Sequence, residues 1–346
     1  MSSSHATLTT IVLKQPYLIL VGDEGDPTYA KTGLGIVQWR RDAVAGQLRM
    51  SPGAVDLGVP DMDIDAAAAA GIGSLIVGVA PVGGRVPDDW WAVMRAAAEQ
   101  GLDVVAGLHT RLTGNAALVA AAAASGARLV DVRVPPPNLP VGTGRKRTGL
   151  RLLTVGTDCA IGKKYAALAM TAALRDAGVD ATFRATGQTG IMIAGEGIPI
   201  DAVVADFIAG AAEVLSPSSA PDHWDVIEGQ GSLFHPAYSG VSMGLLHGSQ
   251  PDAIVVCHDA TRQAVSGWEH YALPSLAECI EVHERLARRT NPEARVVGIS
   301  VNTSALPREL RASWLEELRQ RHHVPAVDPL IDGCAEIVEH LRSVFP

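Results

Sequence analysis

The chain has 346 residues, more than twice the roughly 150 of a typical domain, so two globular domains are expected. Hydrophobic residues make up 47% and charged residues 19%, which supplies enough apolar side chain for buried cores and argues against a largely disordered chain. The formal net charge of -9 argues against nucleic acid or an anionic membrane as the main partner.

Residues 1–135 alternate short β-branched runs with alanine-rich runs, a pattern typical of βαβ units. Strands are predicted at 17–22, 74–79, 102–107 and 128–134, with helices at 92–99 and 115–124. The turn that follows the first strand, Gly22 to Asp26, lacks the GxGxxG fingerprint of dinucleotide-binding folds. We therefore predict a Rossmann-like domain over 1–135 that does not bind NAD.

A proline run at 135–140 and a glycine-containing basic stretch at 141–147 interrupt this alternation. Prolines cannot pair in the interior of a sheet, so residues 136–149 are predicted to be the linker between two domains. Its basic residues, Arg145, Lys146 and Arg147, are expected to be solvated, with contact to a phosphate as the alternative.

The strand-helix alternation restarts at residue 150 and predicts a P-loop-type α/β domain over 150–346 with a parallel sheet. Strands are predicted at 152–155, 181–184, 225–227, 253–257, 296–301 and 324–327, and helices at 163–177, 201–215, 276–289, 307–321 and 333–344. Asp201 is expected to be the N-cap of the second of these helices.

The strongest local signal is a strand that runs through a glycine-bounded loop, Gly156 to Gly162, into a long helix. Backbone N–H groups, the helix N-terminus and Lys163 are suited to bind phosphate there. The loop has one residue more than the usual P-loop, and Lys164 replaces the Ser or Thr that holds Mg²⁺. The sequence thus predicts a phosphate-binding loop and argues against Mg-dependent phosphoryl transfer. Cys159 within the loop is expected to be structural, with a nucleophilic thiol as the alternative.

Glu228 follows an apolar strand and precedes a glycine-rich loop. Ligands of open α/β sheets bind at the carboxyl ends of the strands, so Glu228 is expected beside the phosphate-binding loop, as base, metal ligand or binder of a substrate amine. His235 in the same loop is either a proton-transfer group or only a hydrogen-bonding residue.

A third glycine-rich segment spans 184–197. Gln188 and Thr189 are expected to supply neutral donors to a ligand, and Arg184 is either a clamp for a carboxylate or a surface residue. His247 and Asn302 are further candidates at predicted loop or strand-end positions.

Several motifs together resemble those of a bacterial family whose function was long unknown and which includes D-glutamate N-acyltransferases. They are Gly156-Thr157-Asp158-Cys159, Thr186-Gly187-Gln188-Thr189-Gly190, Pro199-Ile200-Asp201-Ala202, Glu228-Gly229-Gln230-Gly231-Ser232, His235-Pro236-Ala237-Tyr238-Ser239-Gly240 and Gly244-Leu245-Leu246-His247-Gly248-Ser249. The resemblance implies a Rossmann-like N-terminal part and a P-loop C-terminal part. A more distant likeness to dethiobiotin synthetase rests on 156–163, Glu228-Gly229 and Asn302.

The resemblance implies acyl transfer from acetyl-CoA, as co-substrate, to the amino group of a small acidic amino acid such as D-glutamate. The loop would hold the phosphates of coenzyme A through Gly156, Thr157, Gly162, Lys163 and Lys164, with Asn302 at the base-binding position. The base would be Glu228 or Asp158, with His235 in reserve, and no metal is expected. Lys164 and Arg184 would face the substrate carboxylates, and the other substrate contacts would come from Gln188, Thr189, Ser232, Tyr238 and His247.

Two alternatives remain open at this stage. In a Mg-ATP-dependent ligase or kinase acting on a small carboxylate, Asp158 and Glu228 would hold Mg²⁺ and Lys163 would stabilise the transferring phosphoryl group. A regulatory protein that senses a nucleotide would use the same loops without turnover.

The four cysteines lack the spacing of a zinc site or a disulfide framework, and the sequence lacks an apolar stretch that approaches the roughly 18 residues of a membrane span. We expect a cytoplasmic protein with reduced thiols that acts on a small molecule. A homo-oligomer is expected from the prevalence of symmetric assemblies among soluble proteins.

Overall fold

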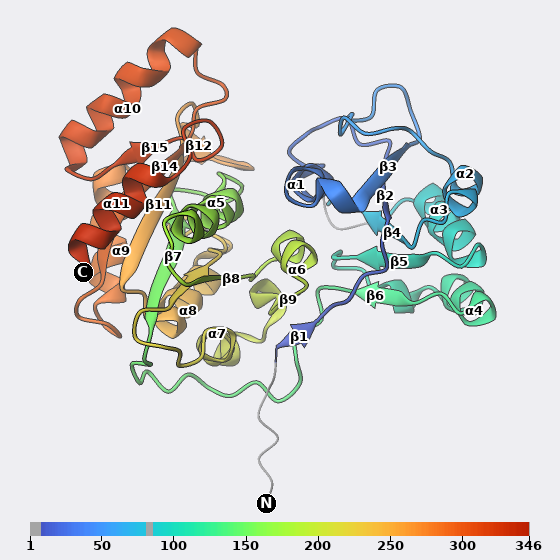
Figure 1. Cartoon of the computed structure of the whole chain (residues 1–346), viewed down its shortest axis with the longest axis horizontal. Coiled ribbons are helices and arrows are strands. Elements are labelled where there is room, and N and C mark those ends of the chain that lie inside the picture. Colours follow the sequence, from blue (N-terminus) through green and yellow to red (C-terminus); the bar gives the residue numbers. More distant parts are fainter. Residues whose placement is uncertain (1–7, 81–85, 346) are drawn as a thin grey trace, which may run out of the picture. The chain divides into compact units, whose positions relative to one another are not determined.

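A computed structural model describes residues 8–80 and 86–345 (Figure 1). The first seven residues of the domain predicted over 1–135 lie outside the described residues. The chain divides into an N-terminal unit, Thr10–Val134 with Gln188–Pro199, and a C-terminal unit that contains Pro135–Gly187 and Ile200–Pro346. The segment Gln188–Pro199 therefore belongs to the N-terminal unit, although the sequence placed it within the C-terminal domain.

The N-terminal unit contains a five-stranded parallel sheet in the order β3-β2-β4-β5-β6. Its strands are β2 (Tyr17–Gly22), β3 (Val44–Arg49), β4 (Ser74–Val77), β5 (Asp103–Ala106) and β6 (Leu129–Asp131). Its helices are α1 (Lys31–Trp39), α2 (Ile64–Ala69), α3 (Asp88–Glu99), α4 (Ala116–Ser125) and α6 (Gln188–Ala194), with 3₁₀ turns at Arg41–Ala43 and Leu112–Gly114. The predicted Rossmann-like architecture is confirmed.

Helix α6 joins the N-terminal unit because it packs on α1. The hydroxyls of Thr32 and Thr189 are 3.0 Å apart, and Arg40 donates to the carbonyl of Ile193 at 3.0 Å. Strand β1 (Thr9–Thr10) is followed by Ile11, whose N–H donates to the carbonyl of Gly195. Gly195 lies between α6 and β9 (Glu196–Gly197).

The C-terminal unit contains a six-stranded parallel sheet in the order β15-β14-β11-β7-β10-β8. The strands are β7 (Leu150–Gly156), β8 (Ala181–Arg184), β10 (Trp224–Ile227), β11 (Ala253–Asp259), β14 (Arg295–Asn302) and β15 (Ala326–Val327). The strands that follow β7 first extend the sheet on its β10 side and then on its β11 side. Strand β7 therefore lies at the topological switch point, where ligands of open α/β sheets bind.

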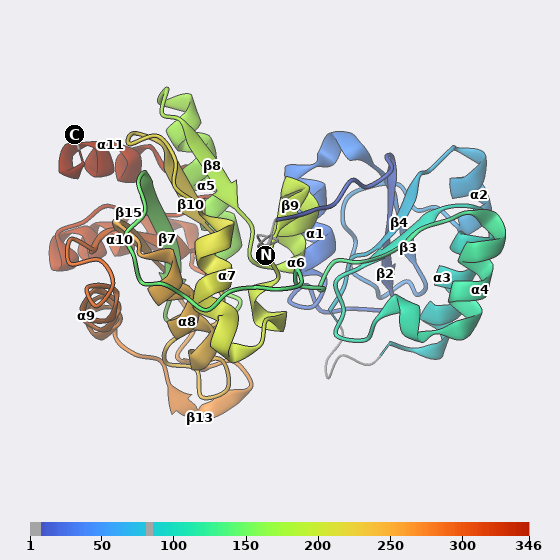
Figure 2. The same cartoon turned by 90° about the horizontal axis from the view of Figure 1, so that it is seen from below.

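Helices cover both faces of this sheet (Figure 2). They are α5 (Lys163–Asp176), α7 (Ile208–Leu215), α8 (Ser239–Ser249), α9 (Leu276–Ala287), α10 (Arg308–His322) and α11 (Ala335–Val344). Helix α5 packs against α11, and α8 packs against both α7 and α9. A short hairpin, β12 (Ala264–Val265) with β13 (Trp268–Ala272), follows β11.

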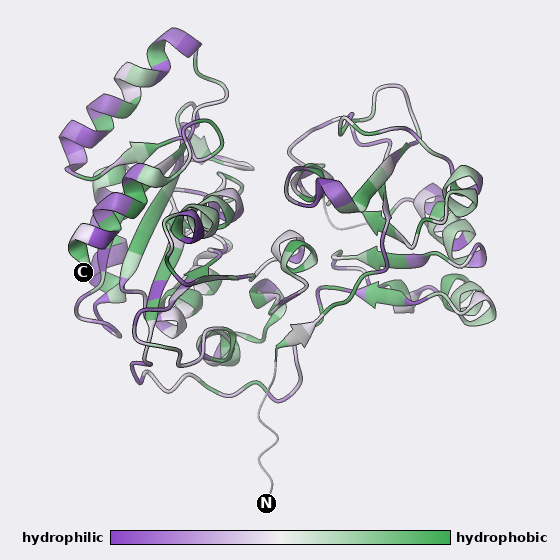
Figure 3. Ribbon diagram, in the orientation of Figure 1, coloured by the Kyte–Doolittle hydropathy of each residue, from purple (hydrophilic) through white to green (hydrophobic). Residues whose placement is uncertain are grey.

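The inner strands of this sheet are apolar along nearly their whole length (Figure 3). The fully buried Arg151 of β7 is an exception. Its guanidinium donates to the hydroxyl of Ser216 and to surrounding backbone carbonyls, so the charge is buried with its hydrogen bonds satisfied.

The structure corrects two expectations about this unit. Asp201 does not cap a long helix, because it lies in the 3₁₀ turn Ile200–Ala202, a second turn follows at Ala205–Phe207, and α7 begins only at Ile208. The basic residues of the predicted linker are not all solvated. Lys146 forms a 2.7 Å ion pair with Asp252, and Arg147 donates to carbonyls of the C-terminal unit.

In the part of the chain that the structure describes, none of the helices is long and apolar enough to cross a membrane.

Candidate active site

Residues Gly156–Gly162 connect β7 to α5 at the carboxyl edge of the C-terminal sheet. Ala160 and Gly162 adopt left-handed backbone conformations, with φ of 51° and 106°, which turn the loop sharply into the helix. Gly162 is the N-cap of α5 and provides no side chain to cap it. The first-turn N–H groups and the positive end of a 14-residue helix thus favour an anion at this loop.

The side chain of Lys163 is buried and holds the loop through a hydrogen bond. Its ammonium donates to the backbone carbonyl of Asp158 at 2.7 Å. Burial lowers the pKa of Lys163, because the charged form is poorly solvated there. A bound phosphate would compensate that charge, as in other phosphate-binding loops.

The carboxylate of Asp158 is buried and holds the loop together. One oxygen accepts the N–H of Cys159 at 2.7 Å, and the other accepts Arg262 and the N–H of Ser266, each at 2.9 Å. Arg262 also donates to the carbonyl of Cys159 at 2.7 Å. With both oxygens occupied, Asp158 is poorly placed to serve as a base or to bind Mg²⁺.

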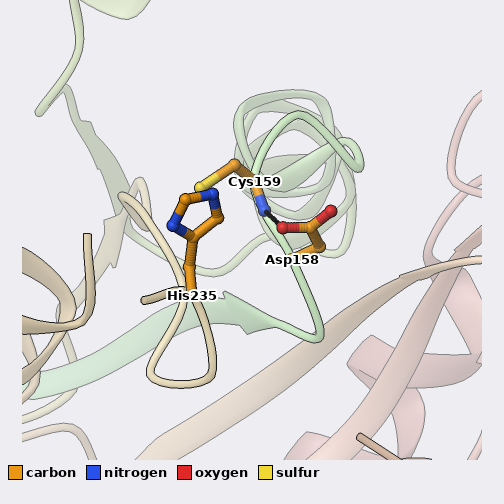
Figure 4. A group of neighbouring side chains, drawn as sticks. All are labelled: Asp158, Cys159 and His235. Atoms are coloured by element: carbon orange, nitrogen blue, oxygen red, sulfur yellow. Dashed lines mark hydrogen bonds between the residues drawn. The ribbon is translucent and has the colours of Figure 1, made fainter. Parts of the chain in front are cut away.

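Asp158, Cys159 and His235 place one ligand-type atom each within 4.8 Å of one another (Figure 4). This spacing alone would suit a metal ion. However, Arg262 already neutralises Asp158, and Nδ1 of His235 accepts the N–H of Ala237 at 3.1 Å. Because its two oxygens already accept Arg262 and two N–H groups, Asp158 is poorly available as a ligand of a divalent metal.

We expect Arg262→Ala to weaken coenzyme A binding by about tenfold while changing kcat by less than about threefold, because it releases the loop without removing a group that meets the acyl carbonyl. Calorimetric titration and steady-state kinetics measure the two effects separately. Arg262→Lys should recover part of the affinity, since lysine keeps the positive charge but lacks the planar set of N–H donors of the guanidinium. Arg295→Ala, which removes an exposed ion pair, is the matched control. Equal losses of affinity in the two alanine variants would contradict this role.

Glu228 lies one residue beyond β10, which pairs with β7. One of its carboxylate oxygens accepts the N–H groups of Thr186 and Gly187 at 2.9 and 3.0 Å. Burial raises the pKa of Glu228, and these two hydrogen bonds and the charge of Lys164 oppose that shift. The structure thus provides a buried carboxylate, poised to accept a proton, beside the phosphate-binding loop.

Ser232 links the loop after β10 to the phosphate-binding loop. Its hydroxyl donates to the carbonyl of Gly156 at 3.0 Å and accepts the N–H of Phe234 at 3.2 Å. The hydroxyl proton is therefore already used, and Ser232 acts here as a structural bridge.

His235 is buried in an aromatic cluster. Its ring stacks on Tyr238 at 4.5 Å and meets Trp268 edge-on at 4.6 Å. Burial lowers the pKa of His235, so the neutral ring is favoured near neutral pH. Because Nδ1 accepts the N–H of Ala237, the hydrogen-bond pattern assigns the proton to Nε2. His235 is thus arranged as a donor rather than as a base.

Three predicted site residues pair with other side chains of the C-terminal unit, and a fourth, His247, lies on a helix. Arg184 forms a 2.6 Å ion pair with Asp225, and Asn302 donates to Asp259 at 3.0 Å. The hydroxyl of Thr157 is 3.0 Å from Nδ1 of His258. His247 lies on helix α8, not in a loop, and its buried Nε2 has no hydrogen-bond partner among the residues that the structure describes.

Gln188 and Thr189 are both buried on α6 of the N-terminal unit. A Cβ added at Gly107 would meet the side chain of Gln188, which therefore packs directly on that backbone. Both side chains are thus packed within the N-terminal unit, while the loops described above belong to the C-terminal unit.

Sequence reasoning missed the segment after β11 that holds the loop. Arg262 and Ser266 both contact Asp158, and Trp268 packs on His235. The position of Arg262 shortly after an apolar strand could have marked it as a strand-end residue. Its pairing with Asp158, 104 residues earlier, has no local signal in the sequence.

A small cavity borders this region and is lined in part by Thr154, Gly156, Gly229, Ser232 and His283. His283 comes from α9 and lies with its Nδ1 2.7 Å from the carbonyl of Cys279. Burial lowers the pKa of His283 to about 4, because the cationic ring would lose its hydration.

The folded chain should therefore lose stability as the pH falls from about 6.5 to about 4, by about 3 kcal/mol from His283 alone. In this interval His283 binds a proton in the unfolded chain but stays neutral in the folded chain. Its contribution to the free energy of unfolding is therefore complete above the pKa of the unfolded state and is lost as the pH falls below it. His283→Gln should remove this part of the pH dependence, while exposed His270→Gln should not. Unfolding by guanidinium at pH 7 and at pH 5 measures the free energy of unfolding at each pH. An equal loss of free energy between the two pH values in His283→Gln and in the parent protein would refute this prediction.

Two α/β units, one Rossmann-like and one built on a phosphate-binding loop, define a P-loop protein of two parts. Residues 140–338 match the family model described as "Domain of unknown function (DUF1611_C) P-loop domain", and residues 46–135 match "Domain of unknown function (DUF1611_N) Rossmann-like domain". The chain belongs to this DUF1611 family, which confirms the resemblance drawn from its motifs.

Two relatives named D-glutamate N-acetyltransferase align over nearly the whole chain. The one from Tritonibacter scottomollicae is 47% identical over 333 residues, covering 96% of this chain and 100% of the relative. The one from Pseudoalteromonas sp is 45% identical over 329 residues, covering 95% and 99%. The crystal structure of a DUF1611 family protein from Anabaena variabilis ATCC 29413 superposes with a TM-score of 0.88 at 32% identity, covering 95% of this chain and 100% of that chain.

Proposed function

We propose that this protein is an N-acetyltransferase that moves the acetyl group of acetyl-CoA to the amino group of D-glutamate or a similarly small acidic amino acid. The observation that carries the proposal is the 47% and 45% identity, over nearly full length, to relatives named D-glutamate N-acetyltransferase. The phosphate-binding loop and the buried carboxylate beside it supply two groups that such a reaction needs.

The donor would bind through its phosphates. Gly156–Gly162, the N-terminus of α5 and the Lys163 ammonium would hold the diphosphate of coenzyme A. The pantetheine arm separates these phosphates from the thioester, so loop contacts would govern affinity more than the rate of the chemical step.

The acceptor amine would need a base. In its ionised form Glu228 would take a proton from the substrate amine, whose nitrogen then attacks the thioester carbonyl carbon. The C–S bond breaks, and the coenzyme A thiolate leaves and takes up a proton. Because Glu228 lies next to the phosphate-binding loop, this role requires the pantetheine arm to turn back toward the sheet edge.

Two predicted substrate contacts, Arg184 and Tyr238, differ in how they could meet a substrate carboxylate. Arg184 already pairs through Nε with Asp225, so a substrate carboxylate would have to share this guanidinium with Asp225. Tyr238, 47% exposed at the edge of the aromatic cluster, is the better placed of the predicted substrate contacts.

A Mg-ATP-dependent ligase or kinase is not favoured. Lys164 replaces the metal-binding hydroxyl, and Arg262 and two N–H groups occupy Asp158, one of its two predicted metal ligands. The names of the relatives also favour turnover over a purely regulatory nucleotide sensor.

Incubation of the purified protein with acetyl-CoA and single amino acids tests this proposal. We expect thiol release with D-glutamate, together with an N-acetyl product detected by mass spectrometry, and much slower release with D-alanine, which lacks the second carboxylate. L-Glutamate measures the stereochemical preference. Absence of thiol release with every acidic amino acid would contradict the proposal.

A further inference from the structure

P-loop enzymes that transfer phosphoryl groups hold Mg²⁺ at two positions: the Ser or Thr after the loop lysine, and an acid at the end of a neighbouring strand. In this chain the first position is Lys164, the second residue of α5. The second is Glu228, just beyond β10, which pairs with β7 in parallel register. An ammonium cannot coordinate a metal, so the residues present do not fit Mg²⁺ at this place.

The buried hydroxyl of Thr154 brings these two positions together. It donates to the carbonyl of Lys163 at 3.2 Å and accepts the N–H of Gly229 at 2.9 Å. The peptide group between Lys163 and Lys164 and the peptide group between Glu228 and Gly229 are therefore hydrogen-bonded to the same oxygen atom, Oγ1 of Thr154. The backbone around Gly229 also packs closely on Lys163, since a Cβ there would lie 3.0 Å from Cδ of the lysine.

The charges around Glu228 match this placement. Lys164 favours the ionised form of Glu228, and Asp201 opposes it. The ammonium of Lys164 is therefore close enough to the carboxylate of Glu228, beside the phosphate-binding loop, to stabilise its charge. Lys164 also lies 4.3 Å from the ring centroid of Tyr165, a second contact that stabilises the cation.

We propose that the ammonium of Lys164 takes the place of the divalent cation in this phosphate-binding loop, so that the loop binds a diphosphate without metal. The inference rests on the proposed function in that it takes the diphosphate of coenzyme A as the natural ligand. It extends that function by naming Lys164 as the residue that converts a metal-dependent loop into a metal-independent one.

Calorimetric titration of coenzyme A in EDTA and in Mg²⁺ tests this inference with three proteins. The wild type should bind equally in both buffers. Lys164→Thr, which restores the usual P-loop residue, should bind about tenfold more weakly in EDTA and regain affinity in Mg²⁺. Lys164→Arg, which keeps the positive charge, should remain insensitive to EDTA. Circular dichroism and thermal unfolding establish that each variant is folded.

With coenzyme A as the ligand, the inference would be overturned by a wild-type affinity that falls about tenfold in EDTA, or by a Lys164→Thr variant that binds like the wild type in EDTA. Inorganic pyrophosphate in EDTA provides a probe that does not depend on acyl transfer. Metal-free pyrophosphate binding that is lost in Lys164→Thr, without acetyl transfer to any amino acid, would uphold this inference while the proposed function fails. Failure of the wild type to bind either pyrophosphate or coenzyme A would overturn both.

Discussion

Lys163→Ala should weaken the binding of acetyl-CoA by about 10- to 100-fold, because it removes the buried ammonium proposed to bind the phosphates in the loop. Charge-assisted hydrogen bonds of this kind are worth about 1.5–3 kcal/mol, so the loss is large and should appear in KM as well as in the calorimetric affinity. The value of kcat at saturating acetyl-CoA should change much less, because the proposed binding mode places this lysine at the phosphates and not at the acyl carbonyl.

Lys14→Ala is the matched control for this variant. Lys14 is half exposed, pairs with Asp103 in the N-terminal unit, and its loss removes the same charge from the chain. Lys163→Met keeps most of the buried volume and separates the loss of charge from a packing defect. Unchanged affinity in folded Lys163→Ala would exclude the loop as the phosphate site.

Glu228→Gln should lower kcat by about 100- to 10,000-fold while leaving the affinity for acetyl-CoA within about threefold, as expected when a general base is removed. The glutamine oxygen can still accept the N–H groups of Thr186 and Gly187, so the fold of the site should persist. The same substitution at Glu293, a surface carboxylate, should have no effect and serves as the control.

The pH dependence gives a second measurement of the same role. Burial raises the pKa of Glu228, so the wild-type kcat should rise with pH through an apparent pKa above the ordinary 4.5 of glutamate. Below that pH the carboxyl is protonated and cannot accept a proton. This acidic limb should disappear in Glu228→Gln. A variant with near-normal kcat and an unchanged profile would remove Glu228 from the chemistry.

The parallel sheets were predictable because their strands are short, apolar and bounded by turn residues. Strand β3 and helix α1 were missed, as was helix α8, whose glycines disfavour a helix in isolation. In the folded chain those glycines allow close packing on α7. A Cβ on Gly244 would lie 2.6 Å from Ile208, and one on Gly248 would lie 2.2 Å from the carbonyl of Ala209. Tertiary packing overrode local propensity there, and His247 was assigned to a loop for that reason.

The candidate site was predictable where it follows local rules. The loop before Lys163 and the acid after β10 both follow strand-end patterns that a sequence displays. The partners of those residues depend on contacts between distant segments, such as Asp158 with Arg262. The sequence therefore identified Asp158 as a candidate base, while its environment makes it a structural carboxylate.

The most direct test of the account is a pair of calorimetric titrations of the purified protein, one with acetyl-CoA in EDTA and one with ATP in excess Mg²⁺. We predict micromolar binding of acetyl-CoA that needs no metal and is weakened by about 10- to 100-fold in Lys163→Ala, with little affinity for Mg-ATP. Tight, Mg²⁺-dependent binding of ATP without any response to acetyl-CoA would contradict the account and indicate a ligase or kinase that acts on a carboxylate.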